Sequence, residues 1–151
     1  MIECPDCTAS QQNVLEQLQT TAGVTDKVAL AVLMGNIQQE SRFIPNICEG
    51  GAIVPYDRCL RGGYGLIQWT TQRRYDGLGK FCVIHGCDPS SLKGQTRYMI
   101  QEMRWRDELY AFQTNHQQVS FYMNAAYHWL GWGIHGKRTE YSYSFLNKLK
   151  K

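Results

Sequence analysis

The chain lacks the long apolar runs and the strongly biased charge that mark several classes of protein. Its longest uncharged apolar stretch, Val28 to Met34, is seven residues, whereas a membrane-spanning helix needs about 20. The 16 basic and 13 acidic side chains leave a net charge of only +3, which is weak support for a polyanionic partner. We therefore expect neither membrane insertion nor nucleic-acid binding.

The sequence also lacks repeats, low-complexity tracts, linkers and a recognisable secretory segment. The start, Met1 to Pro5, has neither a basic nor an apolar region of the signal-peptide type. Hydrophobic residues make up 43% and charged residues 19%, which is ordinary globular composition. We predict no signal peptide at this start and one folded domain over residues 1–151.

Spacings typical of metal sites are missing as well. The four histidines show no His-Glu-x-x-His pattern, so we expect neither a metal nor a cofactor. The six cysteines form an even set, which is typical of disulfides outside the cytoplasm. A four-thiolate zinc site is the less favoured alternative, because the two-residue gap between the first two cysteines is not repeated later.

One cysteine pairing can be predicted. Cys48 with Cys59 would clamp a loop that contains glycine and proline. The other pairings stay open, because a continuous helix across Cys82 to Cys87 would hold those two too far apart to bond.

Helical periodicity dominates what is present. A segment from Lys27 to about Ser41, with Thr25 or Asp26 as its N-cap, is apolar on almost every side over its first half. This pattern predicts a central, buried helix. The other predicted helices are, in order, Thr8 to Gly23 with a Thr8–Gln11 capping box, one after Thr71, one capped by Ser91 that carries Met99, Met103, Trp105, Leu109 and Phe112, one from Ser120 to Leu130, and one opened by Thr139.

Between Pro45 and Trp69 the helical pattern is replaced by glycines and prolines around short apolar pieces. Such a composition favours turns and a small β-hairpin. The predicted fold class is therefore α+β and predominantly α-helical, with a small hairpin or loop region between the central helix and the remaining helices.

The central helix carries a carboxyl group at the end of its apolar stripe. Leu33, Ile37 and Glu40 lie at positions i, i+4 and i+7, so Glu40 should point inward. Burial and the negative end of the helix dipole both disfavour a carboxylate, so we expect the pKa of Glu40 to be raised. A carboxylic acid that stays protonated can protonate the leaving oxygen of a glycosidic bond.

Two ordered motifs resemble those of phage tail lysozymes. The segment Gly35 to Asn46 (GNIQQESRFIPN) resembles that family's catalytic helix, and its Glu-Ser-x-Phe-x-Pro-Asn run is similar to that of soluble lytic transglycosylases and goose-type lysozymes. Gly62 to Thr70 (GGYGLIQWT), followed by Arg73-Arg74, resembles the family's glycine-rich strand. A block ending at Tyr127 is loosely similar to the Ala-Tyr-Asn stretch of transglycosylases, with His128 in place of Asn. The resemblance covers about residues 27 to 130.

The resemblance implies a lysozyme-like fold, with Glu40 as general acid in cleavage of the N-acetylmuramic acid to N-acetylglucosamine bond of bacterial peptidoglycan. Glu49 is the expected second carboxylate and Asp57 its rival; either would steady the oxocarbenium-like transition state or activate a water. A lytic transglycosylase, which needs one Glu and leaves 1,6-anhydro ends, is an alternative. A third is an inactive wall-binding or tail structural module.

The implied setting is a phage tail, with other tail proteins as partners, or a secreted protein acting in the bacterial periplasm or cell wall. Within the glycine block, Gln68 offers a donor and an acceptor to an acetamido group. Strand alternation would place Tyr64 and Gln68 on one face and Trp69 on the other, which favours the first two. The candidate substrate-binding residues are Ser41, Asp57, Tyr64, Gln68, Trp69 and Tyr127.

Overall fold

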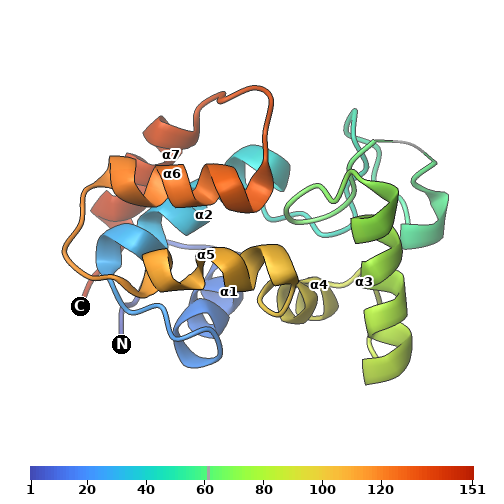
Figure 1. Cartoon of the computed structure of the whole chain (residues 1–151), viewed down its shortest axis with the longest axis horizontal. Helices are drawn as coiled ribbons and strands as arrows, with labels where there is room; N and C mark the ends of the chain where they lie inside the picture. Colours follow the sequence, from blue (N-terminus) through green and yellow to red (C-terminus); the bar gives the residue numbers. More distant parts are fainter. Residues whose placement is uncertain (61) are drawn as a thin grey trace. The chain divides into compact units, whose positions relative to one another are not determined.

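The computed structural model describes residues 1–60 and 62–151, and helices make up most of this part of the chain (Figure 1). The predicted, predominantly α-helical fold class is confirmed. In chain order the elements are α1 (Ala9–Thr20), α2 (Lys27–Ser41), the short 3-10 helix η1 (Tyr56–Arg58), α3 (Gln72–His85), α4 (Leu92–Met99), α5 (Met103–Gln113), α6 (Val119–Leu130) and α7 (Arg138–Lys148).

Contacts divide the chain into two compact units. The terminal unit consists of Met1–Gln39 and Ile100–Lys151, and the middle unit consists of Glu40–Met99. The boundary falls inside α2, so the last two residues of this helix belong to the middle unit. A single catalytic domain over residues 1–151 stays a prediction.

The first two helices begin at the caps that their sequences predict. Thr8 Oγ1 accepts the N–H of Gln11, and the Gln11 side chain accepts the N–H of Thr8, which completes the capping box. Asp26, rather than Thr25, caps α2, because its Oδ1 accepts the N–H groups of Val28 and Ala29 at 2.9 and 3.0 Å.

Helix α2 is the buried centre of the terminal unit, as its sequence predicts. Every residue from Ala29 to Ile37 is buried. Gly35 lies so close to α7 that a Cβ there would be 2.6 Å from the backbone nitrogen of Ser142. On the α6 side, the Asn36 amide lies 3.5 Å from the sulfur of Met123. Helices α6 and α7 therefore both pack directly against α2, and Gly35 allows the close approach of α7.

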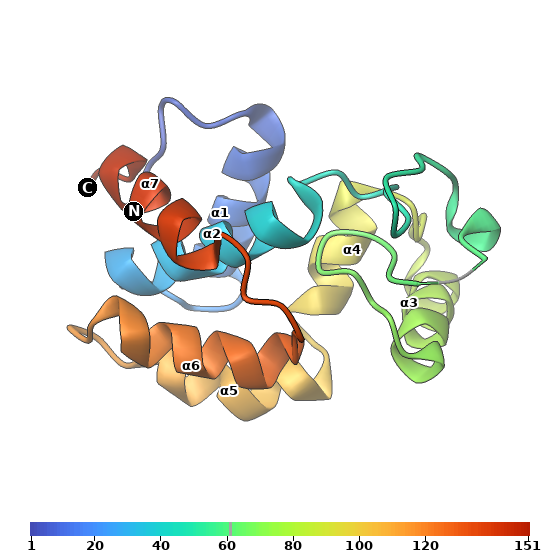
Figure 2. The same ribbon diagram turned by 90° about the horizontal axis from the view of Figure 1, so that it is seen from above.

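Helices α5 and α6 lie side by side in both ribbon views (Figure 2). Trp105 stacks on Phe112 with ring centroids 5.2 Å apart, and Trp129 of α6 meets Trp105 edge-on at 5.1 Å. All three rings are fully buried. At the chain ends, Glu3 and Lys150 exchange backbone hydrogen bonds of 2.7 and 2.8 Å, which holds the termini together.

The single helix predicted between Ser91 and Phe112 is wrong. Ser91 does cap a helix, since its Oγ accepts the N–H of Gly94 at 3.0 Å. However, α4 ends at Met99 and α5 begins at Met103, with extended backbone at Glu102. Met99 and Met103 keep helical spacing across the break, so hydrophobic periodicity could not reveal it.

The middle unit contains α3, α4 and the loop from Pro45 to Trp69, which is held by short backbone pairings. The sequence predicts a small β-hairpin in this loop. In the described residues the loop contains isolated antiparallel bridges and no longer strand. The bridges pair Ile47 with Ile53, Cys48 with Tyr64, and Tyr64 with Trp69.

All six cysteines form disulfides, which excludes the zinc alternative. The predicted pair Cys48–Cys59 is confirmed. The argument against pairing Cys82 with Cys87 is wrong, because α3 ends before Cys87. Gly86 takes the left-handed conformation (φ 70°) and reverses the chain, so the two Cα atoms lie 4.5 Å apart. The third pair, Cys4–Cys7, spans a short turn before α1.

Two disulfides lie outside α3, Cys4–Cys7 and Cys48–Cys59. We expect Cys48–Cys59 to stabilise the protein more than Cys4–Cys7 does. Replacing both cysteines with serine should lower the free energy of unfolding by about 3 kcal/mol, because the bridge closes an 11-residue separation. The Cys4/Cys7 double serine variant should lose about 2 kcal/mol, since its separation is only three residues. Urea unfolding of both variants measures this order, and the reverse order would contradict the loop-length argument.

Candidate active site

Glu40 is the next-to-last residue of α2 and is half-buried. Leu33 and Ile37, which precede it on the same helical stripe, are both 0% exposed. The position therefore agrees with the predicted one, at the C-terminal end of a buried apolar stripe. At this position the Glu40 side chain is partly exposed to solvent.

Immediately after Glu40 the chain leaves the helix through an unusual turn. Arg42 and Phe43 both have positive φ, 54° and 63°, although neither is glycine. Residues held in this region cost roughly 1–3 kcal/mol each and persist only where surrounding contacts determine them. Phe43, which is 4% exposed, supplies part of that compensation by burying its ring.

Ser41 connects this turn to the glycine block. Its hydroxyl donates to the backbone oxygen of Leu66 at 2.7 Å and accepts the N–H of Phe43 at 3.2 Å. Ser41 is only 3% exposed. The Ser41 hydroxyl is therefore already hydrogen-bonded inside the protein, and the role of Ser41 in substrate binding stays a prediction.

The glycine block folds back on itself within four residues. Tyr64 and Trp69 exchange backbone hydrogen bonds of 2.9 and 3.2 Å, which close the turn Gly65 to Gln68. Gln68 itself has positive φ, 53°. The expected alternation of Tyr64 and Gln68 along one strand face is wrong, because the chain reverses direction between them.

Gln95 of α4 anchors this turn and was not found from the sequence. Its side-chain oxygen accepts the N–H of Leu66 at 2.8 Å, while its nitrogen donates to the carbonyls of Pro45 at 2.6 Å and Pro89 at 2.9 Å. Gln95 is 0% exposed. Gly65 is needed beside it, because a Cβ there would lie 2.6 Å from Gln95 Oε1.

Gln68 is partly exposed, and its side-chain nitrogen is engaged in hydrogen bonds inside the protein. The nitrogen donates to the backbone oxygens of Ile47 at 3.2 Å and Gly65 at 3.0 Å. Both amide hydrogens are used in this way, so the carbonyl oxygen is the group of this side chain that could still form a hydrogen bond, as an acceptor. That oxygen lies close to Gly63, where an added Cβ would be 3.0 Å away.

Glu49 is exposed at the rim of the same loop and is held in place by it. The N–H of Gly63 donates to Glu49 Oε1 at 3.0 Å, and the backbone N–H of Glu49 donates to Gly63 O at 2.8 Å. Gly62 has φ 83°, and a Cβ there would lie 2.6 Å from Glu49 Cβ. The glycine pair therefore determines where this carboxylate stands. Asp57 is exposed on η1.

Tyr64 and Trp69, two of the predicted substrate-binding residues, are both 0% exposed. The Tyr64 hydroxyl donates to Val54 O at 2.8 Å, and the Trp69 ring packs on Tyr98 with centroids 5.5 Å apart. These side chains support the turn from inside. Tyr127, by contrast, lies on α6 of the terminal unit and is 47% exposed.

A cluster of three tyrosines supports η1 and the start of α3. Tyr56 and Tyr75 stack with centroids 4.2 Å apart, and each hydroxyl donates to the other residue's backbone oxygen. Tyr64 meets both rings edge-on. Burial is the main cause that raises the pKa of Tyr75 to about 12, and the nearby phenols of Tyr56 and Tyr64 raise it further.

No group of three potential metal ligands was found in the described part of the chain, and no helix there is long and apolar enough to cross a membrane. This mostly helical architecture, with a buried central helix that leads into a glycine turn, is consistent with a lysozyme-like fold.

The phage tail lysozyme family profile matches residues 10–139. Because this range is most of the chain, the protein belongs to the phage tail lysozyme family. Membership indicates a peptidoglycan-lytic phage protein. Searches of curated proteins and of solved structures gave no match.

Replacing Gln95 tests how far the glycine turn depends on α4. Gln95→Met keeps the size of the side chain but removes its amide. The N–H of Leu66 and the carbonyls of Pro45 and Pro89 would then lose the hydrogen bonds that they make with this amide. We expect a loss of about 3 kcal/mol in the free energy of unfolding, since stranded buried polar groups cost roughly 1–3 kcal/mol each. Gln72→Met, at an exposed position on α3, is the matched control. Urea unfolding measures both, and equal losses would remove Gln95 from its anchoring role.

The tyrosine cluster predicts an alkaline weakening of the fold. Because the folded-state pKa of Tyr75 is about 12, against an ordinary 10, its stabilising effect is fully present below pH 10. It is lost as the pH rises from about 10 to 12, where the unfolded chain releases this proton and the folded chain does not. In Tyr75→Phe the free energy of unfolding should fall less steeply over that window. Tyr110→Phe, at a position that is 85% exposed, is the matched control, and equal flattening of the slope in both variants would contradict the role given to Tyr75.

Proposed function

We propose that the protein is a muramidase that hydrolyses the bond between N-acetylmuramic acid and N-acetylglucosamine in bacterial peptidoglycan, with Glu40 as general acid. The observation that carries the proposal is the position of Glu40, half-buried at the end of α2 and followed by Ser41, whose hydroxyl binds the glycine turn. Family membership supports a lytic action on peptidoglycan.

In the proposed reaction Glu40 transfers its proton to the glycosidic oxygen as the bond between the sugars breaks. The location at a helix C-terminus favours the protonated form that this step needs, because the negative end of the dipole opposes ionisation. The partly buried setting adds to this effect by disfavouring charge.

Glu49 is the proposed second carboxylate. Its hydrogen bond from Gly63 N–H gives it a defined position at the rim of the loop, where it can steady the oxocarbenium-like transition state or activate a water. Asp57, exposed on η1, is the other candidate for this role or for contacting substrate. We further propose that the Gln68 carbonyl accepts a hydrogen bond from an acetamido N–H.

The motif around Glu40 also supports a second candidate reaction. Its Glu-Ser-x-Phe-x-Pro-Asn run is similar to that of soluble lytic transglycosylases, in which one glutamate suffices and a hydroxyl of the sugar attacks. The same bond is broken in both cases, so the two reactions differ in their products. An inactive wall-binding or tail structural module is the third candidate. The proposed place of action is the cell wall, reached from the phage tail.

Glu40→Gln tests the general acid. The amide keeps the shape of the side chain but cannot supply the proton, so clearing of a purified peptidoglycan suspension should slow by about 10²- to 10⁴-fold. Glu16→Gln, on the exposed face of α1, is the matched control and should clear at the parent's rate. Thermal unfolding of both variants verifies that they are folded.

Three outcomes would contradict parts of this proposal. A parent protein that does not clear peptidoglycan would leave only the inactive module. Clearing by Glu40→Gln at the parent's rate would contradict the role of Glu40 as general acid. Mass spectrometry of the fragments separates the two reactions, because 1,6-anhydro ends would replace the muramidase by the transglycosylase.

A further inference from the structure

Aromatic side chains gather at the surface of the terminal unit where α6 ends and α7 begins. The connecting segment, residues 131–137, contains Trp132 and His135 and is termed the aromatic loop. Tyr127 of α6 lies against Trp132 with ring centroids 5.2 Å apart, and His135 lies 5.7 Å from Trp132. Tyr127 is 47% exposed, His135 is exposed and Trp132 is partly exposed. The core of this unit is filled by other rings, so burial does not account for the cluster.

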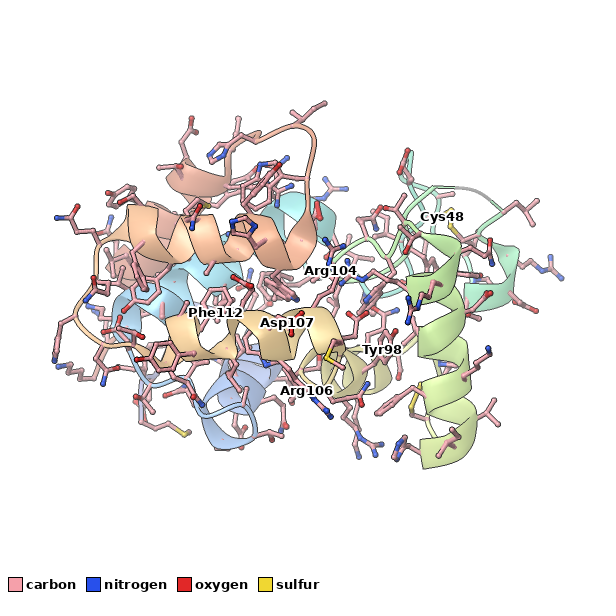
Figure 3. The ribbon with its side chains drawn as sticks, viewed as in Figure 1. Cys48, Tyr98, Arg104, Arg106, Asp107 and Phe112 are labelled. Atoms are coloured by element: carbon pink, nitrogen blue, oxygen red, sulfur yellow. A yellow bond between two sulfur atoms is a disulfide. The ribbon has the colours of Figure 1, made fainter. Side chains whose placement is uncertain are left out.

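The aromatic loop is held at both ends. Gly131 ends α6 in the left-handed conformation (φ 66°) and lies against Arg104 of α5, which is labelled in Figure 3; a Cβ on Gly131 would be 3.3 Å from Arg104 Nη2. At the other end, the N–H of Lys137 donates to Gln39 Oε1 at 2.9 Å. Gly136 is required there, because a Cβ would overlap the Gln39 amide.

The Trp132 ring rests on a buried cation. The guanidinium of Arg138 lies 4.1 Å from the ring centroid, and Arg138 is only 2% exposed. Its Nη1 donates to Asn36 Oδ1 at 3.1 Å, and the Asn36 amide donates to Val32 O at 2.8 Å inside α2. This network restrains the Trp132 ring before any ligand is bound. Binding a ligand against the ring would therefore cost little further side-chain entropy of Trp132.

The chemistry of this surface fits a saccharide better than an apolar partner. Each ring combines an apolar body with polar groups: the Tyr127 hydroxyl, the indole N–H of Trp132, and the two His135 nitrogens, of which Nε2 already lies 2.9 Å from Thr139 Oγ1. Sugars have the matching arrangement, with C–H faces that pack on rings and hydroxyl edges that hydrogen-bond. Lys137, which is exposed beside the rings, would favour a glycan that also carries carboxylates.

We propose that Tyr127, Trp132 and His135 form a saccharide-binding surface of the terminal unit, with Arg138 as the residue that positions Trp132. The identification of its ligand as the peptidoglycan glycan strand rests on the proposed function. The surface binds glycan without taking part in bond cleavage, so its contribution is to hold the protein on its substrate.

The test measures binding with turnover removed. In the Glu40→Gln protein, isothermal titration with a soluble N-acetylglucosamine tetramer and sedimentation with purified peptidoglycan sacculi both report affinity. Adding Trp132→Leu or Tyr127→Ala should weaken each by about five- to tenfold, since an aromatic contact has about that effect on an equilibrium. Tyr110→Ala, an equally aromatic and 85% exposed position on α5, should bind as the Glu40→Gln parent does.

Unchanged affinity in both Trp132→Leu and Tyr127→Ala, with thermal unfolding showing folded proteins, would overturn the saccharide surface. Unchanged saccharide affinity together with a change in sedimentation velocity would also overturn it and would assign the surface to protein contacts. Failure of the parent to clear peptidoglycan would instead contradict the proposed function, while weaker tetramer binding by the variants would still support the surface.

Discussion

The middle unit depends on how the buried peptide groups of Leu66 are satisfied. Its N–H is bound by Gln95 and its carbonyl by Ser41, at 2.8 and 2.7 Å. A turn that is buried cannot use water for these groups, and leaving them unpaired would cost several kcal/mol. Side chains from α4 and from the end of α2 therefore meet at one residue of the glycine turn. Gly65 allows this meeting, because any larger residue would displace Gln95.

This constraint also explains why the end of α2 is a suitable place for chemistry. Ser41 is anchored to Leu66, and Glu40, the proposed acid, directly precedes it, so this hydrogen bond restrains the end of the helix, where fraying is common. The left-handed pair Arg42 and Phe43 then turns the chain away sharply. A reacting group that is held in one geometry has less freedom to lose on reaching the transition state, which would favour the proposed proton transfer from Glu40.

Local signals account for what could be predicted from the sequence. The capping box at Thr8, the Asp26 cap of α2 and the loop bridge Cys48–Cys59 depend on residues near each other in the chain. The errors arose where a local pattern continued through a change in direction. Helical spacing persisted between α4 and α5, and the left-handed Gly86 brought Cys87 back to its partner at the end of α3. In each case a local change in backbone conformation ended the helix, at Glu102 or at Gly86, although the hydrophobic pattern of the neighbouring residues did not change.

The sequence by itself determined the helical class, the buried course of α2 and the location of Glu40 at the end of its stripe, because helix period and caps act over a few residues. Only the tertiary structure decided the burial of Tyr64, the anchoring role of Gln95 and the support of Trp132 by Arg138. The Gln95 contact joins residues 29 positions apart in the chain. A buried amide that binds backbone groups so distant has no local signature, since its partners are chosen by packing and by the need to satisfy every buried polar group.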